Sequence, residues 1–447
     1  MSLLEIGRKA VSIDSSVSQG TVDIAQYLLG VAINLGLEAE IFNETYHGID
    51  NASLWITNSN ASAPKEFLLV SHLDTAEPGE YFRWIKTGAN PFQASIDGDH
   101  VYGLGTADAK FDFIAKMLAL AATEKKTYTK IRPVLAGTFG PESSQGLIKL
   151  LRRKKFKPAG ALVGRPTGLQ LANRGPGYAL IEIAIPFGSE EKKYRETHDL
   201  IENSHSQSKV FSGINKFGLE PDFYDNPIVK SLEYLKLLPT GMAVISLEGG
   251  TSPLSAPDIA VLELDIVDGF EQGMMNKLSG LYEVLKKFSG AFRDITAEGF
   301  TPAHSTFNVG QIQSDSEEIK ISGSCRLVPT VTHEIYEKWL QQLRNDCEKL
   351  GARFHVVDYK PPFTGVIDGD LYKVCKQALG EEKLSAELIS TTLASEASFF
   401  SRIKCECYVF GAGQSVGSSH IANEHISMNS LRSSQEFYKN VIDRYCL

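Results

Sequence analysis

Four short segments of the sequence carry histidine or carboxylate side chains at or near the end of an apolar run. The candidate residues in these segments are His72, Asp74, Asp108, Glu142, His420, Glu424 and His425. In hydrolytic enzymes these residue types bind zinc, or two metal ions bridged by a carboxylate. A single histidine or aspartate at a strand end is usually a structural hydrogen-bonding group. Several of them at one edge of one sheet favour a metal site.

Buried strands and helices alternate around these candidate residues. The runs EFLLVSHLD, IRPVLAGTF and AGALVGRPT are typical of buried strands, and FDFIAKMLALAATEKK and GLIKLLRRKKF are typical of the helices between them. Such alternation predicts an α/β domain with a largely parallel sheet. Because parallel strands present their carboxyl ends at one edge, we expect the four segments to meet at that edge.

The pattern of the chain changes near Gly177. The run YALIEIAI alternates in the manner of a half-covered antiparallel strand. A strand–strand–helix order then occurs twice, and the first type of alternation resumes after PPFTG. We therefore predict a discontinuous α/β catalytic domain at 1–177 and 359–447. The inserted α+β domain is expected at 178–358, with one extra strand–strand–helix unit.

The composition excludes several classes of partner. The net charge of −9 argues against nucleic acid, since phosphate binding needs a basic surface. No apolar run approaches the roughly 20 residues that a membrane helix needs, and the N-terminus lacks the core of a signal peptide. We expect a cytoplasmic protein without a membrane partner. Its six scattered cysteines, among which only Cys405 and Cys407 are close, are expected to be reduced thiols.

Several motifs together resemble a known family, and the resemblance covers nearly the whole chain. The motifs are SHLDTAEPGE, YGLGTADAK, GRPTGLQ, NSHSQS, LASEASFF and FGAGQSVGSSHIANEHI. They are similar to those of the co-catalytic zinc metallopeptidases that include acetylornithine deacetylase, succinyl-diaminopimelate desuccinylase, carboxypeptidase G and aminoacylase. YGLGTADAK and SEASFF are most similar to acetylornithine deacetylase. The resemblance implies hydrolysis of an N-acyl amino acid or peptide. It also implies that the inserted domain is a lid that makes a homodimer contact.

The resemblance assigns metal ligands to four residues of this chain. Asp108 matches the aspartate that bridges two zinc ions in the family. His72 matches a ligand of one zinc, and Glu142 and His420 match ligands of the other. Glu142 would therefore also belong to the catalytic set.

Other roles implied by the resemblance concern catalysis and substrate. Asp74 matches the aspartate that orients the ligand histidine. His205 matches a lid histidine that reaches across the dimer to stabilise the oxyanion. A substrate-binding asparagine and arginine of the family's lid are replaced here by Leu254 and Val267. Arg326 in SCRLVPT is the candidate for the missing substrate-binding arginine.

This chain departs from the family pattern at two positions that the family uses for catalysis. Pro141 stands where the family has its general base, and it carries no ionisable group. Arg165 stands where the family has a metal-binding glutamate, and a guanidinium stays protonated. We expect Arg165 to occupy one metal position, to pair with Asp108, and to be available to a substrate carboxylate. The chain would then hold one zinc ion or none.

Three functions remain open at this point. The first is a relative of the deacetylases in which ordinary hydrolysis is lost. The second is a remodelled single-metal hydrolase that is active on an N-acyl amino acid or peptide, with Glu424 or Glu77 as the base. The third is a non-catalytic relative that binds a small amino-acid-like ligand or a protein partner.

Overall fold

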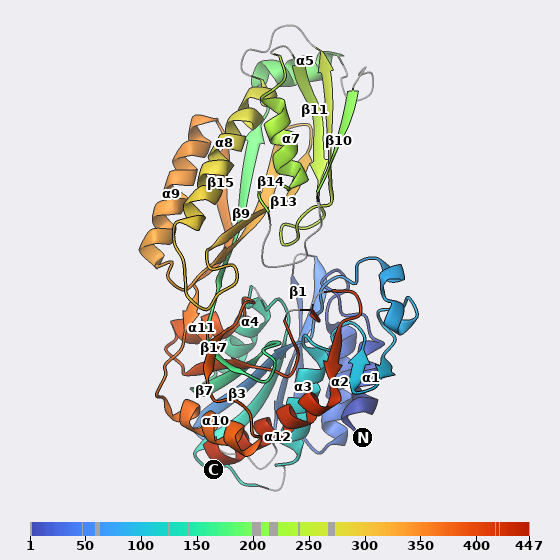
Figure 1. The fold of residues 1–447 in the computed structure, drawn as a ribbon, viewed down its shortest axis with the longest axis vertical. Helices are drawn as coiled ribbons and strands as arrows, with labels where there is room; N and C mark the ends of the chain where they lie inside the picture. Colours follow the sequence, from blue (N-terminus) through green and yellow to red (C-terminus); the bar gives the residue numbers. More distant parts are fainter. Residues whose placement is uncertain are drawn as a thin grey trace. The chain divides into compact units, whose positions relative to one another are not determined.

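The chain folds into two compact units in a computed structural model (Figure 1). The structure describes residues 2–46, 48–58, 63–123, 126–141, 143–198, 207–213, 222–239, 242–266, 273–415, 417–419 and 421–446. Unit 1 comprises Met1–Gly175 and Phe363–Leu447, and unit 2 comprises Pro176–Pro362.

Unit 1 is built on a nine-stranded sheet with the order β1-β2-β6-β3-β7-β18-β8-β16, in which β17 also pairs with β8. The strands are β1 (Glu38–Tyr46), β2 (Ile49–Thr57), β3 (Lys65–His72), β6 (Ile131–Thr138), β7 (Pro158–Gly164), β8 (Leu171–Gly175), β16 (Phe363–Thr364), β17 (Leu388–Ser390) and β18 (Cys407–Phe410). The central strands β6, β3, β7 and β18 run parallel to one another. Strands β1, β2 and β16 are antiparallel to their neighbours. The expected α/β architecture with a parallel centre is confirmed.

Helices cover both faces of this sheet. They are α1 (Leu3–Val11), α2 (Val22–Asn34), α3 (Lys110–Ala121), α4 (Gln145–Lys154), α10 (Asp370–Glu381), α11 (Ala397–Arg402) and α12 (Met428–Tyr445). Along β3, Phe67 and Leu69 enter the core formed with α3 and α12, whereas Leu68 and Val70 enter the core formed with α4 and α11. Burial on both faces explains why the strand is a continuous apolar run.

A small three-stranded sheet in unit 1 joins distant parts of the sequence. It has the order β19-β5-β4 and consists of β4 (Ser95–Asp97), β5 (His100–Tyr102) and β19 (His425–Ser427). Pairing of β19 with β5 brings the C-terminal segment next to the segment that leads to Asp108.

Unit 2 is a separate α+β unit, as expected. Its seven strands have the order β10-β12-β11-β13-β14-β9-β15, and every described pairing is antiparallel. They are β9 (Gly177–Pro186), β10 (Gln207–Ser212), β11 (Met242–Gly249), β12 (Ile259–Ile266), β13 (Thr306–Ser314), β14 (Glu318–Leu327) and β15 (Arg353–Lys360). The helices are α5 (Ser189–His198), α7 (Pro227–Leu235), α8 (Met274–Arg293) and α9 (His333–Lys349).

The strand–strand–helix order occurs twice in unit 2, as β11-β12-α8 and β13-β14-α9. Residues of α7, α8 and α9 form one hydrophobic core with alternate residues of the sheet. Strands β9 and β15, through which the chain enters and leaves this unit, pair with each other. Within the described part of the chain, no helix combines the length and the apolar character that a membrane span requires.

Candidate active site

Two parallel strands of unit 1 deliver site residues to the same edge of the sheet. His72 is the last residue of β3, and Arg165 directly follows β7. Because β3 and β7 pair in parallel, with Val70 opposite Val163, these two residues emerge at the same level. On the other side of β3, Thr138 at the end of β6 is the register partner of His72.

Asp108 reaches this edge by a different route from the one we expected. It follows β5 of the small sheet and lies two residues before α3, so it does not end a strand of the main sheet. The buried side chain of Glu424 holds it there. Glu424 Oε1 accepts hydrogen bonds from the backbone N–H groups of Ala107 at 2.8 Å and of Asp108 at 3.0 Å. These contacts engage the carboxylate that we considered as an alternative base.

Arg165, Asp108 and His72 form a buried cluster, and each is at most 3% exposed. Arg165 Nη1 lies 3.0 Å from Asp108 Oδ2, which confirms the expected ion pair. The same nitrogen lies 3.0 Å from His72 Nε2, which is 2.8 Å from Asp108 Oδ1. Arg165 Nε and Nη2 both donate to the carbonyl oxygen of Ala394, at 3.2 Å and 2.6 Å. The guanidinium is therefore anchored on three sides by the protein.

The electrostatics of the cluster favour a protonated His72. Burial lowers the pKa of His72, but the Asp108 carboxylate and hydrogen bonds to Asp108 and Asp74 raise it well above its usual value. His72 Nδ1 lies 2.8 Å from the main-chain oxygen of Asp74, and Nε2 lies near both Asp108 Oδ1 and Arg165 Nη1.

Asp74 connects the histidine with the turn that follows β6. Its Oδ1 lies 3.4 Å from His72 Nδ1, and its Oδ2 accepts a hydrogen bond from the N–H of Gly140 at 3.0 Å. The orienting role of Asp74 stays a prediction, and these are the contacts that it requires. The same contacts also fix the turn that carries Pro141.

A second buried network lies on the opposite face of the strand ends. Asp112 Oδ2 accepts hydrogen bonds from Ser71 Oγ at 2.6 Å and from Lys116 Nζ at 2.7 Å, and Asp112 Oδ1 accepts one from Tyr438. Burial lowers the pKa of Lys116 below its usual value, although the neighbouring Asp112 carboxylate opposes this shift. Ser71 and Gly164 immediately precede the two site residues of β3 and β7, so this network holds the strand ends that carry them.

Of the two metal positions that the family resemblance implies, the one that Arg165 was expected to fill does not fit a metal ion in this chain. Its would-be ligands His72 and Asp108 already contact Arg165, which would have to leave before a cation could bind. Among the residues that the structure describes, no group of three or more His, Cys, Asp or Glu side chains could hold a metal ion. The other position involves Asp108 with Glu142 and His420, and the last two lie outside the described residues.

The remaining predicted residues are placed as follows. His205 and Val267 lie outside the described residues. Arg326 belongs to β14 of unit 2, where its Nη1 donates to the carbonyl oxygen of Pro302 at 3.3 Å. Glu77 is exposed and accepts a hydrogen bond from the N–H of Ser18 at 2.9 Å.

Sequence reasoning missed the contribution of the segment before α11. Besides Ala394, this segment supplies Glu396, which is 1% exposed and accepts a hydrogen bond from Thr138 Oγ1 at 2.9 Å. A carboxylate between small and apolar residues, in the motif LASEASFF, was the available signal. Nothing in the sequence alone shows that this motif meets the ends of β6 and β7.

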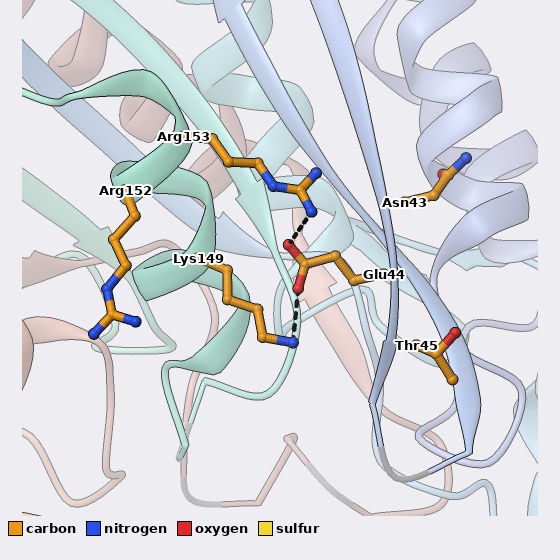
Figure 2. Close-up of a pocket in the computed structure, with 6 residues that line it drawn as sticks. All are labelled: Asn43, Glu44, Thr45, Lys149, Arg152 and Arg153. Carbon is orange, nitrogen blue, oxygen red and sulfur yellow. Dashed lines mark ion pairs between the residues drawn. The ribbon is translucent and has the colours of Figure 1, made fainter.

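A shallow basic pocket also occurs in unit 1, between β1 and α4 (Figure 2). Its volume is about 430 Å³, and none of its residues belongs to the predicted site. It is lined by Asn43, Glu44, Thr45, Lys149, Arg152 and Arg153. Glu44 pairs with Lys149 at 2.8 Å and with Arg153 at 3.3 Å, while Arg152 points away from Glu44 (Figure 2). The internal ion pairs neutralise part of its positive charge.

Comparison of the sequence with known families and proteins gives consistent matches. The profile described as Peptidase family M20/M25/M40 matches residues 68–444. Acetylornithine deacetylase of Yersinia pseudotuberculosis is 22% identical over 445 residues, which covers 97% of this chain and 93% of that protein. The acetylornithine deacetylase of Salmonella typhimurium is 21% identical over 447 residues, with the same coverage of both chains.

Solved structures with similar folds span nearly the whole chain. The M20 family metallo-carboxypeptidase Sso-CP2 from Sulfolobus solfataricus has a TM-score of 0.62 at 16% identity, covering 100% of this chain and 99% of that one. The dipeptidase Dug1p from Saccharomyces cerevisiae has a TM-score of 0.62 at 12% identity, covering 99% and 95%. At these identities the likeness concerns the fold alone.

Proposed function

Because this chain belongs to peptidase family M20/M25/M40, we propose that it keeps the fold of an amide hydrolase but has lost ordinary two-metal hydrolysis. The position of Arg165 carries this proposal. Its Nη1 lies 3.0 Å from each of the two side-chain atoms, Asp108 Oδ2 and His72 Nε2, that would otherwise face a metal ion. A guanidinium cannot lose its proton in a protein, so it remains a cation at this position.

The turn after β6 supports the same proposal. Pro141 replaces the expected general base, and loss of a general base typically lowers a rate by about 10²–10⁴. Arg165 could stabilise negative charge that develops on an oxygen atom. It cannot lower the pKa of a bound water molecule as a metal ion does. Water activation would therefore lack both the general base and the metal ion at the Arg165 position.

The ligand that fits this proposal is a small amino-acid-like molecule. Acetylornithine deacetylases and a dipeptidase are among the similar proteins, and their names describe amino-acid amides as substrates. We propose that this chain binds such a molecule at the strand ends of unit 1. The single-metal hydrolase, with zinc at Asp108, Glu142 and His420, is the competing function.

Metal analysis combined with an activity assay tests the proposal. We expect purified protein, equilibrated with zinc, to hold at most one zinc ion per chain and to hydrolyse N-acetylornithine and simple N-acyl amino acids at no measurable rate. The double variant Pro141→Glu/Arg165→Glu should bind more zinc than wild type. Pro141→Glu alone should not, because Arg165 would still fill one position.

A matched control and a contradictory outcome complete the test. Arg152→Glu makes the same charge reversal at an exposed arginine outside the site and should leave the zinc content unchanged. Two zinc ions per wild-type chain would contradict the proposal. So would a turnover of about 1 s⁻¹ or more, in the ordinary range of enzymes, that disappears in Glu142→Ala.

A further inference from the structure

Glu396 is a buried carboxylate with a single described hydrogen bond. Its Oε1 accepts one hydrogen bond, from Thr138 Oγ1. Its Oε2 is out of contact with solvent and has no hydrogen-bond partner among the residues that the structure describes. Buried carboxylates are normally paired with a cation or bound by several donors, because burial removes the water that stabilises their charge. Glu396 therefore lacks part of what a purely structural carboxylate would have.

Three other buried carboxylates of unit 1 have more partners than Glu396. Asp112 accepts hydrogen bonds from a lysine, a serine and a tyrosine. Glu424 accepts two backbone N–H groups, and Asp108 faces the guanidinium of Arg165. Asp74 is the nearest parallel, since its buried Oδ1 also accepts no hydrogen bond from the described residues, but that atom lies 3.4 Å from His72 Nδ1.

The position of Glu396 links it to the candidate site. Thr138, which holds Oε1, is the register partner of His72 on the neighbouring strand. Ala394, two residues before Glu396, is the residue whose carbonyl oxygen accepts both Arg165 Nε and Arg165 Nη2. Glu396 therefore lies next to residues that contact the same strand ends as the buried cluster of Arg165, Asp108 and His72.

The balance of charge at these strand ends favours a cationic ligand group. Asp74, Asp108, Asp112 and Glu396 contribute four negative charges, and Arg165 and Lys116 contribute two positive charges. The sum is negative whether or not His72 carries a proton. Such a site attracts cations.

We propose that Glu396 is a ligand-binding carboxylate that accepts a primary ammonium group, while Thr138 fixes its other oxygen. An ammonium group supplies N–H donors and a positive charge, both of which an ionised carboxylate accepts. A divalent metal ion would need more oxygen ligands than this carboxylate offers. Because Oε2 is enclosed, ligand contact requires neighbouring side chains to move, and the resulting ion pair would be shielded from water. The inference rests on the proposed function, in which the site binds an amino-acid-like molecule.

Calorimetry on the full chain with three related compounds tests the inference. N-acetyl-L-norvaline has no ammonium group, N-acetyl-L-ornithine has one on its side chain, and L-norvaline has one on its α-carbon. We expect at least one ammonium compound to bind about tenfold or more tightly than N-acetyl-L-norvaline, in line with hydrogen bonds to charged groups. Glu396→Gln should abolish this preference, and Thr138→Val should weaken it.

Control measurements separate a ligand-binding role from a structural one. Glu387→Gln, an exposed glutamate in the same segment, should keep the preference. Glu396→Gln should melt at the same temperature as wild type or higher, because it removes an unpaired buried charge. Equal binding of all three compounds, no binding of any, or a preference that survives in Glu396→Gln would overturn the inference. If that variant does not fold, an unchanged preference in Thr138→Val would overturn it. The zinc content of wild type tests the proposed function separately.

Discussion

At the scale of single residues, the strand ends of unit 1 depend on a glycine, Gly164. Gly164 precedes Arg165, and a Cβ added there would lie against Asp112 Oδ2, 2.6 Å from Lys116 Nζ and 2.8 Å from Ser71 Oγ. These are atoms of the buried network and not the ends of exposed, flexible side chains. The requirement for glycine is therefore one of space.

We expect Gly164→Ala to destabilise the protein by about 1–3 kcal/mol or more, since overpacking a core forces shifts of side chains and backbone. Chemical denaturation measures the loss. Gly30→Ala is the matched control, because Gly30 lies within α2 and a Cβ there meets nothing within 4 Å. Alanine is the better helix former, so the control should be neutral or stabilising by up to about 1 kcal/mol. Equal effects of the two substitutions would contradict the role given to Gly164.

At the scale of elements, the sequence predicts the strands more completely than their meeting points. The strand that ends at Gly164 and the arginine after it are visible in AGALVGRPT, and the family resemblance supplied the expected ion pair with Asp108. The contact of Arg165 with Ala394 joins residues 229 positions apart. The contact of Glu424 with Asp108 joins residues 316 positions apart. Such contacts depend on strand order and on the small sheet, and local periodicity contains neither.

The packing of α8 against α9 in unit 2 gives an expectation about acid stability. Asp346 Oδ2 accepts hydrogen bonds from Lys287 Nζ at 2.8 Å and Gln342 Nε2 at 2.8 Å, and Lys349 Nζ lies 2.9 Å from Oδ1. Hydrogen bonds from Lys287 and Lys349 lower the pKa of Asp346 below its ordinary value near 3.8. A carboxylate with a lowered pKa in the folded state stabilises that state above its unfolded pKa, and the contribution is lost as the pH falls.

We expect Asp346→Asn to be less stable than wild type at pH 7, with a difference that shrinks as the pH falls below about 4. Thermal melts of both proteins between pH 7 and pH 2.5 measure it. The effect should be modest and weakened by salt, because Asp346 lies close to the surface. Glu348→Gln on the same helix is the control and should show no such convergence. A pH-independent difference would attribute the effect to packing.

At the scale of the whole molecule, each unit has its own hydrophobic core. The core of unit 2 contains residues of its sheet and of α7, α8 and α9. The homodimer expected from the resemblance stays a prediction. We expect the fragment 176–362 to fold by itself, since a domain with its own core can do so.

Circular dichroism and a cooperative thermal transition of that fragment would test this expectation. Leu278→Asp is a suitable negative control, because Leu278 is fully buried on α8 and a buried unpaired charge prevents packing. A wild-type fragment without a cooperative transition would show that unit 2 depends on the rest of the chain.

The pairing of β9 with β15 also has a mechanical consequence. Tyr178 lies opposite Lys360, so the two chain crossings into unit 2 are at the same end of two antiparallel strands. Tension applied between the protein's termini reaches unit 2 through this pair and loads its hydrogen bonds one after another rather than all together. In a single-molecule pulling experiment, unit 2 should therefore unzip from β9 and β15 at low force. Pulling along the long axis of those strands, from Pro186 to Lys360, loads their hydrogen bonds together and should meet much greater resistance.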